Sequence, residues 1–87
     1  MNASFVTLKV PQEFWALSAL PEGYIERWLV SDGARIEVGV PVALVRIEGA
    51  LHRLLAPATG KLRIDSAANS VVDPGMPVGQ ITPQLDA

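Results

Sequence analysis

The residues of this 87-residue chain that could do chemistry are few, and they do not form a recognisable catalytic or metal-binding set. His52 is the sole histidine, and no serine–acid pair or second metal ligand stands at a recognisable spacing from it. The carboxylates are spread singly along the chain, so none are paired for general acid–base work. Cysteine is absent, which excludes a thiolate metal site, a cysteine nucleophile and a disulfide framework. We therefore expect neither enzymatic activity nor a metal site.

The composition indicates a folded chain with a buried core. Apolar residues make up 49% of the sequence and the mean hydropathy is +0.30, which is typical of a globular domain and not of a disordered chain. Residues 1–87 are short enough to form a single domain. The net charge is −2 and the basic residues are scattered, whereas a nucleic-acid site needs a basic stripe. The chain has neither a long apolar run nor a signal-peptide pattern, so we expect a cytoplasmic protein that contacts neither nucleic acid nor a membrane.

The chain repeats itself at an offset of 36 residues, with residues 21–45 matching residues 57–81. The match has no gap, apart from a one-place slip between Gly23 and Gly60, the glycines that follow each leading proline. The other matches include Arg27 with Arg63, Ile36 with Val72, and Gly39–Val42 with Gly75–Val78. Each copy of a repeat is a supersecondary unit that cannot bury its apolar face alone. Two copies predict one small domain with internal two-fold pseudosymmetry, in which each half covers the core of the other.

Short β-type runs separated by turn signals predict an all-β sandwich or barrel. The predicted strands are residues 4–10, 24–30, 42–48, 51–56, 60–65, 70–72 and 78–82. Side chains alternate between the two faces of a strand, so Leu54 and Leu55 are expected on opposite faces, with one of them at the surface. The segment 12–20 is predicted to be a long loop with a helical turn, since it is too short for a helix that is stable on its own.

Glycine and asparagine mark the predicted turns. The turn at residues 31–33 needs a positive φ at Gly33, and Asn69, the next-best residue for that conformation, stands at the matching position. Gly49 and Ala50 join two predicted strands, and a glycine at the first central position is typical of a type II′ hairpin.

With these strands laid out, the chain resembles the biotinyl/lipoyl carrier domain family over nearly its whole length. The family motifs Glu-Gly-x-Val-x-x-Trp-Leu-Val-x-x-Gly, Ala-Pro-x-x-Gly and Val-x-x-Gly-x-Pro-Val occur here in the family's order and spacing. The matching segments are Val10-Pro11, residues 22–33, 36–41, 47–48, 56–60 and 72–78. The resemblance implies a flattened barrel or sandwich of two four-stranded antiparallel sheets with a quasi-two-fold axis, and a buried aromatic anchor at Trp28.

The chemistry of that family depends on one lysine at a hairpin tip, and this chain lacks it. The corresponding interval is residues 49–55, which contains no lysine and puts Gly49 and Ala50 at the tip. It is two residues shorter than is usual in lipoyl domains. Removing one residue from each of the two strands leaves the remaining side chains on the same faces of the sheet. Lys9 and Lys61 lie outside the hairpin, and arginine lacks the nucleophilic amine that an amide link to lipoate or biotin needs. We therefore expect no attached cofactor.

Four residues are candidates for contact with a partner protein. Phe14 and Trp15 lie in the segment between the first two predicted strands, which the resemblance places near the carrier hairpin and associates with recognition by partner enzymes. Adjacent aromatic side chains in a loop either fold back as a lid over the sandwich edge or stand exposed as a binding anchor. Leu51 and His52 lie beside the shortened tip. If Trp15 is an exposed anchor, Trp15→Ala should weaken binding to the partner with little change in the stability of the fold.

We expect a non-catalytic, unmodified lipoyl-like domain that works through protein–protein contact. The resemblance implies a partner that handles lipoyl or biotinyl carriers, such as a component of a 2-oxoacid dehydrogenase-type complex or a carboxylase. Two alternatives stay open. One is a true swinging-arm carrier modified on Lys9 or Lys61. The other is a lipoyl-like adaptor domain of an export system, although those domains are normally interrupted by a long helical hairpin that is missing here.

Overall fold

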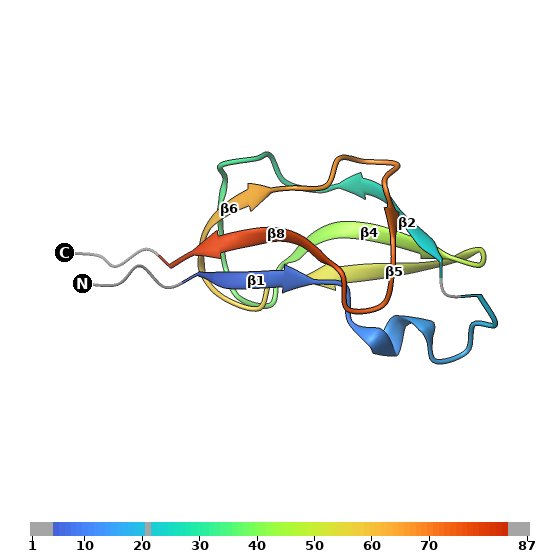
Figure 1. The fold of residues 1–87 in the computed structure, drawn as a ribbon. Coiled ribbons are helices and arrows are strands. Elements are labelled where there is room, and N and C mark those ends of the chain that lie inside the picture. Colours follow the sequence, from blue (N-terminus) through green and yellow to red (C-terminus); the bar gives the residue numbers. More distant parts are fainter. Residues whose placement is uncertain (1–4, 21, 84–87) are drawn as a thin grey trace.

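The computed structural model describes residues 5–20 and 22–83, which form two antiparallel sheets of four strands each (Figure 1). Sheet A has the strand order β1-β8-β6-β3 and sheet B the order β5-β4-β2-β7. The strands are β1 Val6–Lys9, β2 Gly23–Trp28, β3 Arg35–Ile36, β4 Pro41–Ile47, β5 Ala50–Leu55, β6 Gly60–Ile64, β7 Val71–Val72 and β8 Pro77–Thr82. The all-β fold predicted from the sequence is confirmed, and it is a flattened sandwich, not a closed barrel.

Every buried side chain in the described part of the chain is apolar, so the core is one apolar layer. The core residues are Leu8, Val10, Trp15, Ile25, Ile36, Val42, Ala43, Val45, Ile47, Leu54, Ala56, Leu62, Val72, Val78 and Ile81. Leu54 is 1% exposed and Leu55 49%, which confirms the predicted alternation along β5. Trp28, predicted as a buried anchor, is only half-buried. Its ring lies at the margin of the core because its Nε1–H donates to the carbonyl oxygen of Ser66 at 2.8 Å.

The two sheets are counterparts of each other, as the repeat predicted. Replacing β1, β8, β6 and β3 by β5, β4, β2 and β7 converts the strand order of sheet A into that of sheet B. The registers agree as well, since Ile36 pairs with Gly60 in sheet A and Val72 pairs with Gly23 in sheet B. The two sheets therefore have the same strand order and the same pairing register.

The matching turns confirm this equivalence in detail. Gly33 has a φ of +87° and Asn69 a φ of +72°, the left-handed conformation predicted for both. The backbone N–H of Gly33 donates to the carbonyl oxygen of Leu62, and that of Asn69 donates to Ile25, each at 2.7 Å. The two turns are thus held to matching strands by the same hydrogen bond.

The one-place slip in the repeat has a structural cause, a β-bulge at Glu26. Strand β2 pairs with β4 in regular register up to Ile25 and again from Arg27, so Glu26 has no cross-strand partner. The corresponding strands β6 and β8 pair without interruption. Glu26 is therefore the residue by which β2 exceeds β6, and it displaces Gly23 by one place relative to Gly60.

The β4–β5 hairpin differs from the prediction. Ile47 pairs with Ala50, so the two loop residues are Glu48 and Gly49 and not Gly49 and Ala50. Their φ values are +47° and +83°, and positive φ at both positions defines a type I′ turn instead of the predicted type II′. A type I′ turn follows the right-handed twist of the flanking strands, which compensates for the left-handed backbone of Glu48.

Two short elements complete the described fold. Strand β3 was not predicted although the equally short β7 was, because β7 consists of two valines, which favour strands, whereas β3 has one arginine and one isoleucine. A 3₁₀ turn, η1 at Gln12–Trp15, follows β1 and confirms the predicted helical turn in this loop. In the described ranges there is no helix with the length and apolar character needed to cross a membrane.

We predict that Gly60→Ala destabilises the protein by about 2 kcal/mol or more, because a Cβ there would overlap the carbonyl oxygen of Thr82 on the neighbouring strand. Gly33→Asn is the matched control. Asparagine already occupies the equivalent turn at Asn69, and the nearest atom to a Cβ at Gly33 is the Cε of Lys61 at 3.8 Å. Urea denaturation of the two variants checks this, and equal losses of stability would contradict it.

Candidate functional site

The 12–20 segment and the β4–β5 hairpin lie together at one end of the molecule (Figure 1). The backbone N–H of Leu20 donates to Oε2 of Glu48 at 2.8 Å, which ties the end of the segment to the hairpin loop. A hollow of about 260 Å³ lies between them and is lined by both, with Phe14 and Leu17 on one side and Glu48 and His52 on the other. The expected proximity of segment and hairpin is confirmed.

Phe14 and His52, both candidate contact residues, are in direct contact. Their rings stack with centroids 4.8 Å apart and planes inclined by 18°. Both side chains are half-buried, so each keeps part of its surface open to solvent. The stack joins η1 to strand β5 and fixes the position of the loop beside the hairpin.

The sequence left two roles open for Trp15, a lid over the sandwich edge or an exposed binding anchor, and the structure decides between them. Its side chain is only 8% exposed and belongs to the core cluster, so it is a lid and not an exposed anchor. The turn of η1 separates the two adjacent rings, sending Trp15 into the core and Phe14 toward His52. Trp15 Nε1 has no hydrogen-bond partner among the described residues. This residue therefore supports the site and does not form part of its surface.

Exposed leucines lie on both elements at this end of the molecule. Leu17 lines the hollow and is fully exposed. Leu20, 60% exposed, ends the segment, and Leu51, 46% exposed, follows the hairpin turn and pairs with Arg46 on the outer face of sheet B. The sequence singled out Leu51 but not Leu17 or Leu20, because nothing in the pattern says which face of a short loop is covered. We call Phe14, Leu17, Leu20, Leu51 and His52 the tip surface.

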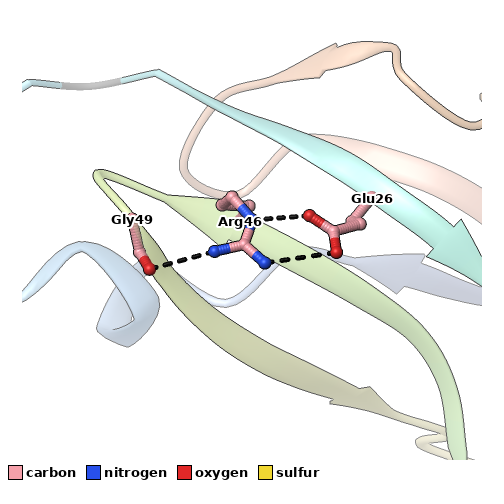
Figure 2. Close-up of polar contacts among 3 residues, drawn as sticks. All are labelled: Glu26, Arg46 and Gly49. Atoms are coloured by element: carbon pink, nitrogen blue, oxygen red, sulfur yellow. Dashed lines mark hydrogen bonds and ion pairs between the residues drawn. The ribbon is translucent and has the colours of Figure 1, made fainter.

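An ion pair supports the hairpin from the outer face of sheet B (Figure 2). Arg46 donates from Nε and Nη2 to the two carboxylate oxygens of Glu26, and from Nη1 to the carbonyl oxygen of Gly49 at 3.0 Å. Two parallel bonds from one guanidinium make a directional pair. The hydrogen bond from Arg46 holds the pKa of Glu26 below its ordinary value. The bulge at Glu26 and the turn at Gly49 are thus linked through one side chain.

Neither lysine lies on the hairpin. Lys9 is in β1 and Lys61 in β6, both strands of sheet A, whereas the hairpin belongs to sheet B. Within residues 5–20 and 22–83, no group of three or more histidine, aspartate or glutamate side chains could hold a metal ion. The tip surface offers apolar, aromatic and imidazole groups for contact and presents no amine for covalent attachment.

Comparison with known proteins adds no relative to this description. No model of a known protein family matches the chain, and no curated protein matches it. The resemblance to biotinyl/lipoyl carrier domains stays a prediction based on the motifs quoted above.

We predict that Trp15→Ala destabilises the protein by about 3–5 kcal/mol, since it leaves a large cavity beside the core. Trp15→Phe should cost less, because phenylalanine fills most of the space and removes the buried N–H that lacks a partner. Denaturant unfolding of both variants measures the difference. A stable Trp15→Ala protein would show that this side chain is not part of the core.

We predict that the ion pair between Glu26 and Arg46 stabilises the fold only above acidic pH. The folded-state pKa of Glu26 is lowered from its ordinary 4.5, so its contribution is present above 4.5 and is lost as pH falls through the folded value. The melting temperature of Glu26→Gln should lie below that of the wild type at pH 7, and the two should converge as pH falls from 4.5 through the lowered pKa of Glu26 in the folded state. Glu22→Gln, which alters an exposed carboxylate outside the pair, is the control. A gap that is constant with pH would contradict the prediction.

Proposed function

We propose that this protein is a non-catalytic, unmodified lipoyl-like domain that acts in the cytoplasm by binding another protein through the tip surface. The observation that carries the proposal is the hairpin itself, which occupies the carrier position of the resemblance but ends in Glu48 and Gly49 without an amine. The two-sheet sandwich with its internal two-fold repeat is compatible with that resemblance.

The proposed partner is an enzyme that normally handles lipoyl or biotinyl carriers, such as a component of a 2-oxoacid dehydrogenase-type complex or a biotin-dependent carboxylase. A domain that presents a carrier-like hairpin without a carrier group would occupy the docking site and transfer nothing. Its effect would be to assemble or regulate the enzyme. The exposed leucines beside the hairpin support this reading, because exposed apolar groups near a rigid turn favour contact with a complementary surface.

The first test is the intact mass of the protein isolated from its own cells, together with its affinity for purified dehydrogenase and carboxylase components. We expect the mass of the bare chain, with or without Met1, and measurable binding to one of these components by calorimetry. Leu51→Asp and Leu17→Asp should each weaken that binding at least tenfold, since they put a charge into an apolar contact.

The matched control is the double variant Lys9→Arg/Lys61→Arg, which should bind as the wild type does. A lipoyl- or biotinyl-sized increase in mass that the double variant abolishes would replace this proposal with a true carrier. Binding that is unaffected by both leucine substitutions would remove the tip surface from the contact.

A further inference from the structure

The internal symmetry of the sandwich allows its two outer faces to be compared position by position. Tyr24 pairs with Arg46 in sheet B as Lys61 pairs with Thr82 in sheet A. The edge strands obey the same rule, with Leu55 of β5 paired to Pro41 and its counterpart, Lys9 of β1, paired to Pro77. Each outward position of sheet B therefore has a defined equivalent on sheet A.

The two faces carry different side chains at many of these equivalent positions. At Arg46 and Arg53, whose equivalents on sheet A are Thr82 and Thr7, sheet B is the more highly charged face. Four positions that are apolar or aromatic on sheet B are charged or polar on sheet A. They are Tyr24 against Lys61, Val71 against Arg35, Leu44 against Gln80, and Leu55 against Lys9. Phe5, an exposed apolar residue on the sheet A side, precedes β1 and lies outside its ladder.

The fold itself does not account for this difference. Apart from the bulge at Glu26, the two ladders have the same pairing, so they make the same demands on an outward position, and sheet A satisfies those demands with polar side chains. On sheet B, Val71 is 59% exposed, Leu55 49% and Tyr24 38%. Apolar groups that remain this accessible on one face, where the equivalent face is polar, mark a surface that is covered by something else.

The charges on sheet B indicate the chemistry of what covers it. Arg27 and Arg53 lie on either side of Leu44 in one cross-strand row. Within the described residues neither has an acidic partner, whereas Arg46 is neutralised by Glu26. On sheet A the equivalent of Arg27 is Arg63, which pairs with Asp65. The face of sheet B thus combines exposed apolar groups with two unpaired guanidinium groups, and arginine and tyrosine are typical of protein contact surfaces.

A second copy of this chain does not fit that surface face to face, because it would bring arginine rows together without countercharges. We propose that the outer face of sheet B is a docking surface for a different protein, one that presents carboxylates among apolar side chains. This inference rests on the protein-contact part of the proposed function and extends the contact from the tip surface across the whole sheet. It does not depend on the identity of the enzyme.

Photo-crosslinking in the cells that make the protein tests this inference with the full chain. Benzoylphenylalanine is introduced in place of Tyr24 or Val71 on sheet B and, as matched controls, in place of Lys61 or Arg35 at the equivalent positions of sheet A. We expect the two sheet B positions to form an adduct with one protein and the two sheet A positions to form none. The crosslinked peptide should contain aspartate or glutamate beside apolar residues.

Charge reversal provides the second measurement. In the crosslinker background, Arg27→Glu/Arg53→Glu should reduce the adduct yield at least tenfold, and Arg27→Lys/Arg53→Lys should keep most of it. Both arginines are exposed, so we expect these substitutions to leave the fold intact, and circular dichroism is the measurement that checks it.

Several results would overturn the inference. These are adducts of equal yield from both sheets, adducts formed only with a second copy or with lipid, no adduct from either face, and a yield that is insensitive to charge reversal. A crosslinker placed at Leu17, which lies on the tip surface and outside both sheets, serves as a further comparison, and adducts formed only there would overturn the inference while leaving the proposed function in place. A lipoyl or biotinyl group found on the chain would have the opposite effect, removing the proposed function and leaving this surface.

Discussion

The structure depends on one constraint, that each half of the chain can bury its apolar face only against the other half. All buried side chains of the described residues lie in a single apolar layer to which both sheets contribute. The chain passes between the sheets through tight turns, and these rely on left-handed residues at matching positions, Gly33 with Asn69 and Gly39 with Gly75. A core shared in this way leaves neither half stable alone. This packing fixes the turns, and the turns fix the positions of the β4–β5 hairpin and of the outer faces of both sheets.

Once the two halves are known to be equivalent, their differences become informative. Core packing constrains equivalent positions of the two sheets in the same way, so a difference between such positions needs another explanation. The departures are the bulge at Glu26, the extension of β4 and β5 into a hairpin, and the apolar outer face of sheet B. The first two are linked by Arg46, which joins the bulge to the turn (Figure 2). The proposed contacts lie on the hairpin and on the same sheet.

The fold could be predicted from the sequence because its determinants are local and repeated. Alternating apolar residues, the turn at Gly33 and its counterpart at Asn69, and the 36-residue offset all lead to the same architecture. The site was less predictable. The orientation of Trp15 depends on a four-residue 3₁₀ turn, and the hairpin type depends on whether Glu48 accepts a left-handed backbone. Both are decided by tertiary packing and strand twist, which leave no mark in the local pattern. The outer face of sheet B could not be recognised either, because it is assembled from separate strands.

The bulge at Glu26 also shows how this ladder accommodates a change in chain length. An extra residue inside a strand ordinarily turns every following side chain to the opposite face. Here Ile25 and Trp28 both point inward although three positions separate them, because the bulge absorbs the additional residue locally. The insertion alters one half of the molecule without any compensating change in the other. Any alignment of the two halves, or of this chain with others, therefore has to allow a single-residue gap within a strand, where gaps are usually forbidden.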